Sequence, residues 1–323
     1  MKYVKSNKIG WGVRLAMAAM VMMIFGATSI CSAMTRTLKA DPAIVIVAFG
    51  TTTKARATYD FFEEQLRASL PEQYQKYKIA WAFTSEIVRE RANQKFAEQG
   101  AATRYRSLPQ VLADLEDEGY RRVGLQSLHI FPGQEYLDME REIAAFAGLG
   151  MRIEYGGTLF HEWEGVFETI EHLEQEFLAP DQGSNVLVVH GTPQTFPGSN
   201  STYLGLDRYL SRKYKNVFVA GVDGVLTRDQ ALEQAKAYPG KRVRLIPMMY
   251  VAGDHIMNDI MGKEADKHGV PSWAMELEAA GLAVDSPSVS YRGADYFKGL
   301  GFYPLIDQLF IKELLESMER LEK

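Results

Sequence analysis

The sequence repeats one pattern in its two halves, and this duplication limits the chain to folds built from two similar units. Residues 123–135 read VGLQSLHIFPGQE, and residues 243–255, 120 positions later, read VRLIPMMYVAGDH. Each segment is an apolar run followed by a glycine and, two places after that glycine, an ionisable residue. That residue is Glu135 in the first half and His255 in the second.

A second pair of segments supports the duplication. Residues 43–52 (AIVIVAFGTT) and 185–193 (NVLVVHGTP) are apolar runs, typical of buried strands, that break into Gly-Thr. They match Phe49 of the first half with His190 of the second. Different ionisable side chains at equivalent strand ends predict a cleft with unlike chemistry on its two walls.

Short apolar runs alternate with stretches of helical spacing, which predicts β-α-β units and parallel sheets. The expected strands are 44–49, 79–83, 123–130, 153–159, 186–189, 217–222 and 243–250. The expected helices of the second half are 203–210, 228–237, 255–267 and a last helix at 305–321. We therefore predict an α/β protein with two similar lobes, each a parallel sheet flanked by helices. The predicted divisions are a signal peptide (1–33), an N-terminal linker (34–42), an N-terminal lobe (43–178), a linker (179–184) and a C-terminal lobe (185–323).

The first 33 residues have the layout of a secretory signal. A basic stretch without acids is followed by an uncharged run (15–30) and by the small residues of 31–33. The strongly apolar part, residues 15–25, is too short to span a bilayer comfortably. We therefore expect a cleaved signal peptide, a periplasmic mature protein and no stable membrane span after cleavage.

Charge and cysteine content exclude one class of partner and one source of stability. The whole chain has a formal net charge of −5, and removal of 1–33 takes away four basic residues and no acid. The mature net charge is therefore about −9, which argues against a nucleic-acid partner because such partners need a basic face. Cys31 is the only cysteine, so the mature protein relies on its core rather than on disulfides.

Three ionisable residues at matched strand ends form the candidate site. Ligands of parallel α/β sheets bind beyond the carboxyl ends of the strands, where we expect Glu135, His190 and His255. Two imidazoles and a carboxylate suit a divalent transition metal. For each residue alone a simpler role stays open: a histidine can bond to a neighbouring loop, and a glutamate can stabilise the first turn of a helix. Asp254, Asn258 and Asp259 are equally ambiguous, and helix capping is the simpler explanation for Asp254.

Motifs of other enzyme classes are absent from the sequence. There is no GxSxG elbow, no GxxxxGK[ST] loop and no GxGxxG after the first strand. Residues 50–53 (GTTT) resemble an anion-binding turn, although any turn from strand to helix needs such residues. A serine hydrolase or a nucleotide enzyme is therefore not expected. His129, at the end of QSLHI, is a further imidazole near the rim of the predicted cleft, where it could bind a second ligand.

Several segments resemble the single-subunit sirohydrochlorin cobaltochelatases of the anaerobic cobalamin pathway, which are class II chelatases. The matching segments follow in family order along nearly the whole mature chain: AFGT (48–51), AFTS (82–85), QSLHI (126–130), GQEY (133–136), HG (190–191), VAGDH (251–255) with Asn258 and Asp259, and SW (272–273). VAGDH and QSLHI are specific, whereas HG and FGT alone are weak.

The resemblance implies two α/β lobes with a tetrapyrrole in the cleft between them. It implies that His190 and His255 bind the incoming metal and that Glu135 assists, so all three are the expected catalytic and metal-binding residues. The implied activity is insertion of Co²⁺, with Fe²⁺ as a second metal, into sirohydrochlorin. Because this substrate is a polycarboxylate, we expect basic residues at the cleft. The candidates are Lys54, Arg56, Arg89, Arg104 and Arg106, for each of which ordinary surface charge is the simpler role.

The signal peptide departs from the family, since cobalamin synthesis belongs to the cytoplasm. It motivates an alternative function: an exported carrier of tetrapyrrole, haem or metal on a chelatase scaffold. In a haem carrier, His129 would be an axial ligand, because imidazole commonly ligates haem iron. The sequence does not decide between a monomer and a homo-oligomer.

Overall fold

The computed structural model describes residues 37–195 and 197–323. The predicted signal peptide (1–33) lies outside these residues. The elements below all belong to one compact unit, Lys39–Lys323. Within the described residues, no helix combines the length and the apolar character needed to cross a membrane.

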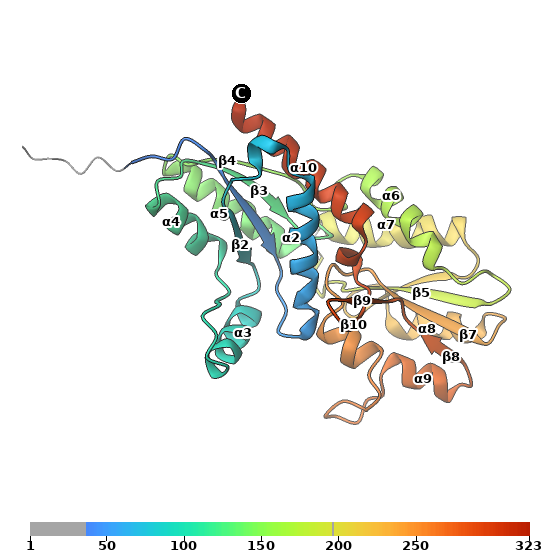
Figure 1. Cartoon of the computed structure of the whole chain (residues 1–323). Coiled ribbons are helices and arrows are strands. Elements are labelled where there is room, and N and C mark those ends of the chain that lie inside the picture. Colours follow the sequence, from blue (N-terminus) through green and yellow to red (C-terminus); the bar gives the residue numbers. More distant parts are fainter. Residues whose placement is uncertain (1–36, 196) are drawn as a thin grey trace, which may run out of the picture. The chain divides into compact units, whose positions relative to one another are not determined.

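The N-terminal half forms a four-stranded parallel sheet in the order β2-β1-β3-β4 (Figure 1). Its strands are β1 (Ala43–Ala48), β2 (Ile79–Phe83), β3 (Arg122–Ser127) and β4 (Arg152–Tyr155). Its helical segments are η1 (Lys54–Arg56), α2 (Ala57–Ser69), η2 (Glu72–Tyr74), α3 (Glu86–Glu98), α4 (Leu108–Asp117) and α5 (Gln134–Gly148).

The C-terminal half repeats this sheet in the order β6-β5-β7-β8. Its strands are β5 (Gly183–Val189), β6 (Val217–Gly221), β7 (Arg242–Pro247) and β8 (Ala283–Asp285). The helical segments from α6 onward are α6 (Trp163–Leu173), η3 (Glu174–Glu176), α7 (Pro197–Lys213), α8 (Arg228–Ala237), η4 (His255–Ile260), α9 (Trp273–Ala279), η5 (Leu300–Phe302) and α10 (Pro304–Glu322). Because the strand order repeats element by element, the predicted α/β fold with two similar lobes is confirmed.

Alternating side chains of the central strands divide the core into layers. Ile44 and Ile46 of β1 face the layer of α2 and α10, whereas Val45 and Val47 face α4 and α5. Leu187 of β5 belongs to the same cluster as Ile44 and Ile46. One hydrophobic core therefore runs through both lobes, and each lobe adds a second layer on its outer face.

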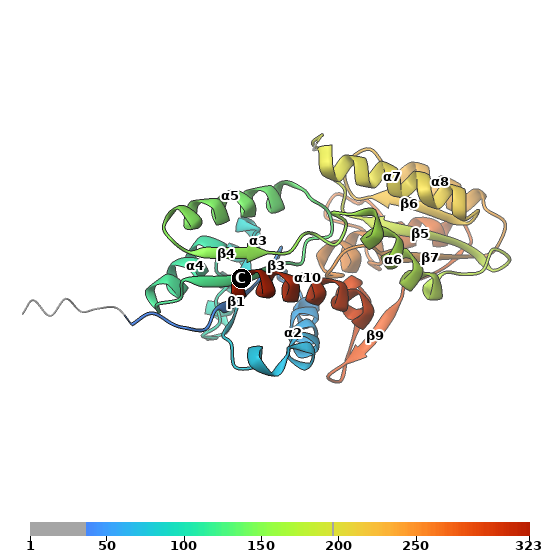
Figure 2. The ribbon, with the colours of Figure 1, turned by 90° about the horizontal axis from the view of Figure 1, so that it is seen from above.

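Two helices cross between the lobes, which a division of the chain at 179–184 does not anticipate. α6 precedes that division but packs on α7, where the rings of Phe167 and Tyr209 lie 5.0 Å apart. α10, which the sequence places in the C-terminal lobe, lies against β3, β4 and α2 (Figure 1 and Figure 2). A Cβ on Gly124 of β3 would lie 2.1 Å from the Met318 sulfur. The last helix therefore belongs by its packing to the N-terminal sheet.

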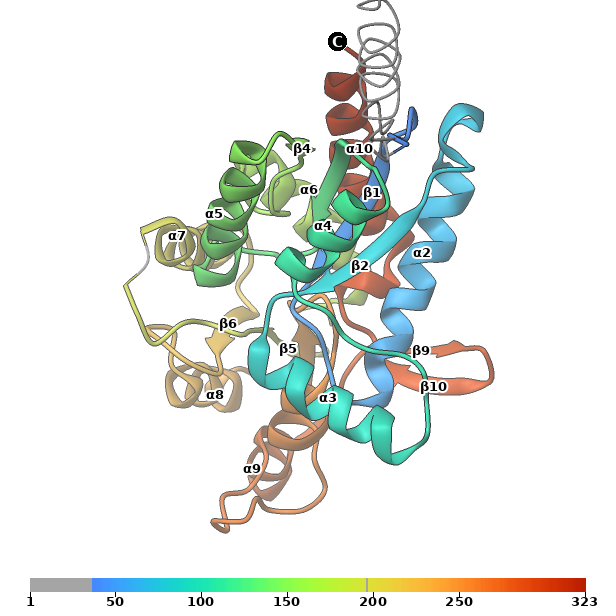
Figure 3. The same ribbon diagram turned by 90° about the vertical axis from the view of Figure 1, so that its left-hand side faces the viewer.

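A hairpin of β9 (Ser288–Tyr291) and β10 (Ala294–Phe297) has no counterpart among the expected elements. Its two-residue turn, Arg292-Gly293, has positive φ at both positions, +49° and +79°, as the favoured hairpin turns require. The hairpin lies beside α2 (Figure 3). Arg292 forms ion pairs there with Asp60 at 3.2 Å and with Glu64 at 2.5 Å. It therefore ties the C-terminal half to the N-terminal lobe.

Candidate functional site

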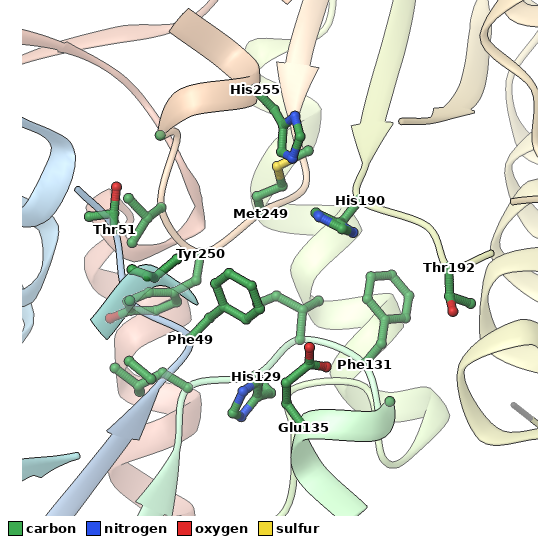
Figure 4. A pocket seen from close by; sticks show the side chains of 18 of the residues that line it. Phe49, Thr51, His129, Phe131, Glu135, His190, Thr192, Met249, Tyr250 and His255 are labelled. Carbon is green, nitrogen blue, oxygen red and sulfur yellow. The ribbon is translucent and has the colours of Figure 1, made fainter. Parts of the chain in front are cut away.

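A cavity of about 660 Å³ lies at the carboxyl ends of the two parallel sheets. Its wall consists mainly of the segments that follow β1, β3, β5 and β7 (Figure 4). Parallel sheets bind ligands at this edge. The candidate residues Glu135, His190, His255 and His129 all line this one cavity.

The loop after β1 and the loop after β5 are held by the same hydrogen bond. The Gly50 amide donates to the Tyr59 hydroxyl at 3.1 Å, and the Gly191 amide donates to the Tyr203 hydroxyl at 3.2 Å. Both glycines have positive φ, +104° and +77°, which other residues rarely adopt. Burial raises the pKa of Tyr59 and of Tyr203, so both hydroxyls stay neutral. The duplication therefore extends from the sheets to the loops of the cavity.

The segments after β3 and β7 also share their backbone geometry. The amides of Gly133 and Gly253 each donate to the carbonyl two residues earlier, at 2.8 Å and 2.9 Å. A helical segment follows each glycine, and the residue two positions after the glycine is Glu135, the second residue of α5, in one half and His255, the first residue of η4, in the other. Equivalent backbone turns thus place a carboxylate and an imidazole at matched positions.

His190 and His255 lie next to each other on the cavity wall, with their ring centroids 5.2 Å apart (Figure 4). Nδ1 of His255 lies 2.6 Å from the Asp259 carboxylate, and Nδ1 of His190 lies 3.1 Å from the Gly191 carbonyl. A neutral imidazole that donates its Nδ1 hydrogen to such an oxygen keeps its lone pair on Nε2. This arrangement makes each Nε2 a potential metal ligand.

The segment that holds this pair, η4, is a six-residue π-helix rather than the α-helix that the sequence predicts at 255–267, and Asp259 stands four positions after His255 in it. The Met261 amide donates to the carbonyl of Ile256, five residues earlier, at 2.9 Å. The turn ends at Gly262, where a Cβ would lie 2.1 Å from the Asn258 carbonyl oxygen. π-Helical turns are rare and occur often at functional sites. Sequence reasoning left Asp259 without a role, although its spacing of four from His255 could have indicated the pair, because side chains four apart on a helix lie next to each other.

Glu135 contributes a carboxylate from the other lobe and points into the cavity (Figure 4). Among residues 37–195 and 197–323, no group of three His, Cys, Asp or Glu side chains is close enough to hold a metal ion. Glu135 therefore stands apart from the histidine pair. The metal set of His190, His255 and Glu135 stays a prediction, with two of its members adjacent in the structure.

His129 lies in the wall of the N-terminal lobe, and both of its ring nitrogens have hydroxyl partners. Nδ1 is 2.6 Å from the Ser127 hydroxyl, and Nε2 is 3.1 Å from the Thr84 hydroxyl. Burial lowers the pKa of His129 to about 4, so the ring is neutral near pH 7. Haem ligation by this residue stays a prediction, and it would have to displace one of the two hydroxyls.

Aromatic side chains form a part of the wall that the sequence did not assign. Phe49 is 42% exposed although it directly follows a buried strand, and its ring centroid lies 6.5 Å from that of His190. The Phe131 ring centroid lies 4.0 Å from that of Tyr203. The alignment of Phe49 with His190 could have indicated this aromatic part of the wall, because it places an apolar ring where the other half has an imidazole.

The threonines of residues 50–53 cap a helix. The hydroxyls of Thr51 and Thr53 lie 2.9 Å apart, and the Thr53 hydroxyl accepts from the Ala55 amide at 3.2 Å. These bonds begin η1. Helix capping therefore accounts for the turn, and an anion is not needed to explain it.

Comparisons with known proteins agree along the length of the chain. The family model of cobalt chelatase (CbiK) matches residues 42–319. Sirohydrochlorin cobaltochelatase of Salmonella typhimurium is 26% identical over 279 residues, which are 85% of this chain and 96% of that protein. Sirohydrochlorin cobaltochelatase CbiKC of Nitratidesulfovibrio vulgaris is 28% identical over 250 residues, which are 74% of this chain and 80% of that protein.

Two solved structures share the fold. They are SirB from Bacillus subtilis with Fe³⁺, at a TM-score of 0.50, and the sirohydrochlorin chelatase SirB from Bacillus subtilis subspecies spizizenii in complex with cobalt, at 0.53. Each is 14% identical in sequence, covering 87% of this chain and 97% of the solved chain. At this identity the likeness shows the two-lobed α/β fold.

Proposed function

The chain belongs to the cobalt chelatase (CbiK) family, and on that premise we propose that it inserts Co²⁺ into sirohydrochlorin. The two curated relatives described above are both sirohydrochlorin cobaltochelatases. The observation that carries the proposal is the histidine pair. Two imidazoles, His190 and His255, lie with ring centroids 5.2 Å apart at the ends of equivalent strands, and each Nδ1 has an oxygen partner.

The histidine pair suits the delivery of a metal ion. Co²⁺ must lose bound water and enter the macrocycle, so its protein ligands must bind the ion and then release it. Neutral imidazoles are ligands of intermediate softness that suit this exchange. The Asp259 carboxylate lies 2.6 Å from Nδ1 of His255, so it holds the ring in place and leaves Nε2 for the ion. We therefore assign His190 and His255 to the incoming metal.

Glu135 suits the removal of protons. The macrocycle must lose two pyrrole protons as the metal enters, and a carboxylate within reach can accept them. Glu135 comes from the lobe opposite the histidines and points into the same cavity (Figure 4). A macrocycle bound between the lobes would take metal from one side and give up protons on the other.

The remaining wall suits a flat apolar ring. Cavities of roughly 300–1,000 Å³ hold small molecules and cofactors, and this one has a volume of about 660 Å³. Phe49 and Phe131 offer aromatic surface next to the histidines. Fe²⁺ is included in the proposal as a second metal, because imidazole and carboxylate ligands accept several divalent ions.

Export is a separate part of the proposal and is supported by the layout of residues 1–33 alone. Cleavage after Ala33 would leave a periplasmic protein that begins at Met34. N-terminal sequencing of the protein from the periplasmic fraction tests this. A cytoplasmic protein that begins at Met1 would refute it.

The first experiment follows the absorbance of sirohydrochlorin with Co²⁺ and the mature protein. A His190→Ala/His255→Ala double variant, a protein-free sample and a His268→Ala control, whose histidine is exposed and does not line the cavity, run beside it. We expect conversion to the cobalt product with the wild type and with His268→Ala, and none above background with the double variant. Conversion at the wild-type rate by the double variant would refute the site assignment.

The same assay separates a chelatase from a carrier. Spectral shifts on tetrapyrrole binding without conversion would indicate a protein that carries its ligand. Haem carriage on His129 would appear as a Soret band in the purified protein. A Soret band that persists in His129→Ala would exclude that residue as the ligand.

A further inference from the structure

The cavity wall contains a single arginine and no lysine among the residues that the structure describes. That arginine is Arg91, in α3. The acidic side chains of the wall are Glu135 and Asp254, and the whole chain has a net charge of −5. An anionic ligand therefore meets an acidic protein, and Arg91 supplies the fixed positive charge on the wall itself.

The five cations expected at the cleft from the sequence do not line the cavity. Their contacts lie elsewhere: Lys54 with the Asp295 carbonyl, Arg56 over the Phe96 ring, Arg89 with the carbonyls of Phe83 and Thr84, Arg104 with the carbonyls of Ala101 and Thr103, and Arg106 with Asp114. None of the five is therefore placed to contact a ligand from the cavity wall, and the cation that is so placed, Arg91, was not singled out in the sequence.

Arg91 differs from these cations because its guanidinium has no partner in the part of the chain that the structure describes. Among the described residues it has no hydrogen bond, ion pair or ring contact, and it is exposed. Val88, three positions earlier, also lines the cavity, so both residues lie on the same face of α3. α3 begins at Glu86, three positions after the last residue of β2, and so lies at the carboxyl end of that strand (Figure 3).

We propose that Arg91 binds a side-chain carboxylate of the tetrapyrrole and so positions the macrocycle in the cavity. The inference rests on the proposed function, whose substrate is a polycarboxylate. A guanidinium matches a carboxylate with two parallel hydrogen bonds, which gives direction as well as attraction. Arg91 acts on the periphery of the macrocycle, and the histidines act at its centre.

This division of roles predicts a specific kinetic effect. A contact that is the same in the bound substrate and in the transition state changes KM and leaves kcat nearly unchanged. Loss of a hydrogen-bonded charge pair weakens binding by about tenfold to a hundredfold. Removal of Arg91 should therefore raise the KM for sirohydrochlorin by about that factor and leave the Co²⁺ affinity of the histidine pair unchanged.

The test compares wild type with Arg91→Met, Arg91→Lys and the control Arg104→Met. Metal-free binding of sirohydrochlorin is titrated by absorbance at several salt concentrations, and cobalt insertion is measured at saturating Co²⁺. We expect Arg91→Met to weaken binding and raise KM by about tenfold or more, with kcat within about twofold. Arg91→Lys should recover part of the lost affinity, because lysine keeps the positive charge but cannot form the two parallel hydrogen bonds of a guanidinium. Arg104→Met should match the wild type, and the salt dependence of binding should be weaker in Arg91→Met.

Each contrary result has a distinct meaning. Wild-type binding and KM in Arg91→Met would overturn the inference and leave the chelatase proposal standing if the wild type inserts cobalt. Equal losses in Arg91→Met and Arg104→Met would overturn it as well, because they would reflect general surface charge. A wild type that neither binds nor metallates sirohydrochlorin would refute the proposed function, and the inference with it.

Discussion

The two halves of the cavity have the same backbone and different side chains. The loop after β1 and the loop after β5 are each held by a glycine amide bonded to a tyrosine hydroxyl, at 3.1 Å and 3.2 Å. The residue before the glycine is Phe49 in one half and His190 in the other. The duplicated scaffold therefore fixes where side chains stand, and the chemistry depends on which side chains occupy those positions.

The difference continues along the next pair of strands. With the offset of 120, Glu135 corresponds to His255, His129 to Met249 and Met139 to Asp259. The two adjacent imidazoles and the carboxylate beside one of them thus lie in the C-terminal half, while the N-terminal half has Glu135, the Phe49 ring and the buried imidazole of His129. We infer that the two walls divide the work of one reaction between them.

The largest expected effect comes from making the C-terminal wall resemble the N-terminal one. His190→Phe should lower cobalt insertion by at least about a hundredfold, a common cost of removing a group that acts on the reacting atoms. Phe49→Ala should instead weaken tetrapyrrole binding and leave Co²⁺ affinity unchanged. Insertion kinetics and Co²⁺ titration check both variants. Equal effects on Co²⁺ affinity would show that the walls are not specialised.

The two strand-end glycines should differ in their tolerance of a side chain. A Cβ on Gly191 would lie 1.8 Å from the backbone oxygen of Asp223, whereas a Cβ on Gly50 would meet the Val88 side chain at 2.9 Å. The positive φ costs either alanine variant about 1–3 kcal/mol. Gly191→Ala should lose more stability than Gly50→Ala, because the backbone of Asp223 can move aside less easily than the Val88 side chain. Urea unfolding measures both, and a greater loss for Gly50→Ala would contradict the comparison.

The free energy of unfolding should depend on pH because of His129, whereas Met249, its counterpart in the other half, does not titrate. Burial lowers the pKa of His129 from 6.5 to about 4, so between these values the unfolded chain binds a proton that the folded chain does not. The free energy of unfolding should therefore fall as pH falls through this window, by up to about 3 kcal/mol from this residue. His129→Met should flatten that part of the curve, measured by urea unfolding at each pH. The exposed-residue control His268→Met should keep the wild-type slope, and an equally steep curve in His129→Met would refute the prediction.

The smallest effect should come from the residue that orients His255. Asp259→Asn removes the charge beside Nδ1 and should lower Co²⁺ affinity by about tenfold, as loss of such a partner typically does. Asp254→Asn is the control, since Asp254 accepts from the Asn258 amide and not from His255. Calorimetric titration of Co²⁺ compares them. Equal affinity in Asp259→Asn and the wild type would show that this carboxylate does not support the metal site.

Local patterns were sufficient for much of the fold. The helix predicted at 228–237 has those bounds in the structure, and β2 has the predicted bounds 79–83. β3 and β7 end earlier than predicted, at Ser127 and Pro247. The predicted strands ran on because the apolar residues that follow line the cavity instead of continuing the ladder.

The same patterns were insufficient where distant segments meet. The packing of α10 on β3 depends on Met318 fitting beside Gly124, which is a contact across nearly the whole chain. The lack of a partner for Arg91 among the described residues is equally invisible in sequence, because it depends on which other cations have found partners. Periodicity reports which face of an element is apolar, and it does not report which other element covers that face.

The sequence by itself determined that the chain has two similar α/β halves and that Glu135, His190 and His255 stand at matched strand ends. It could do so because strand periodicity, glycines and a constant offset are local properties of the chain. Only the tertiary structure decided that the two histidines are adjacent while Glu135 stands apart, and that α6 and α10 cross between the lobes. These features depend on packing and loop geometry between segments far apart in sequence, and that geometry exists only once the core has formed.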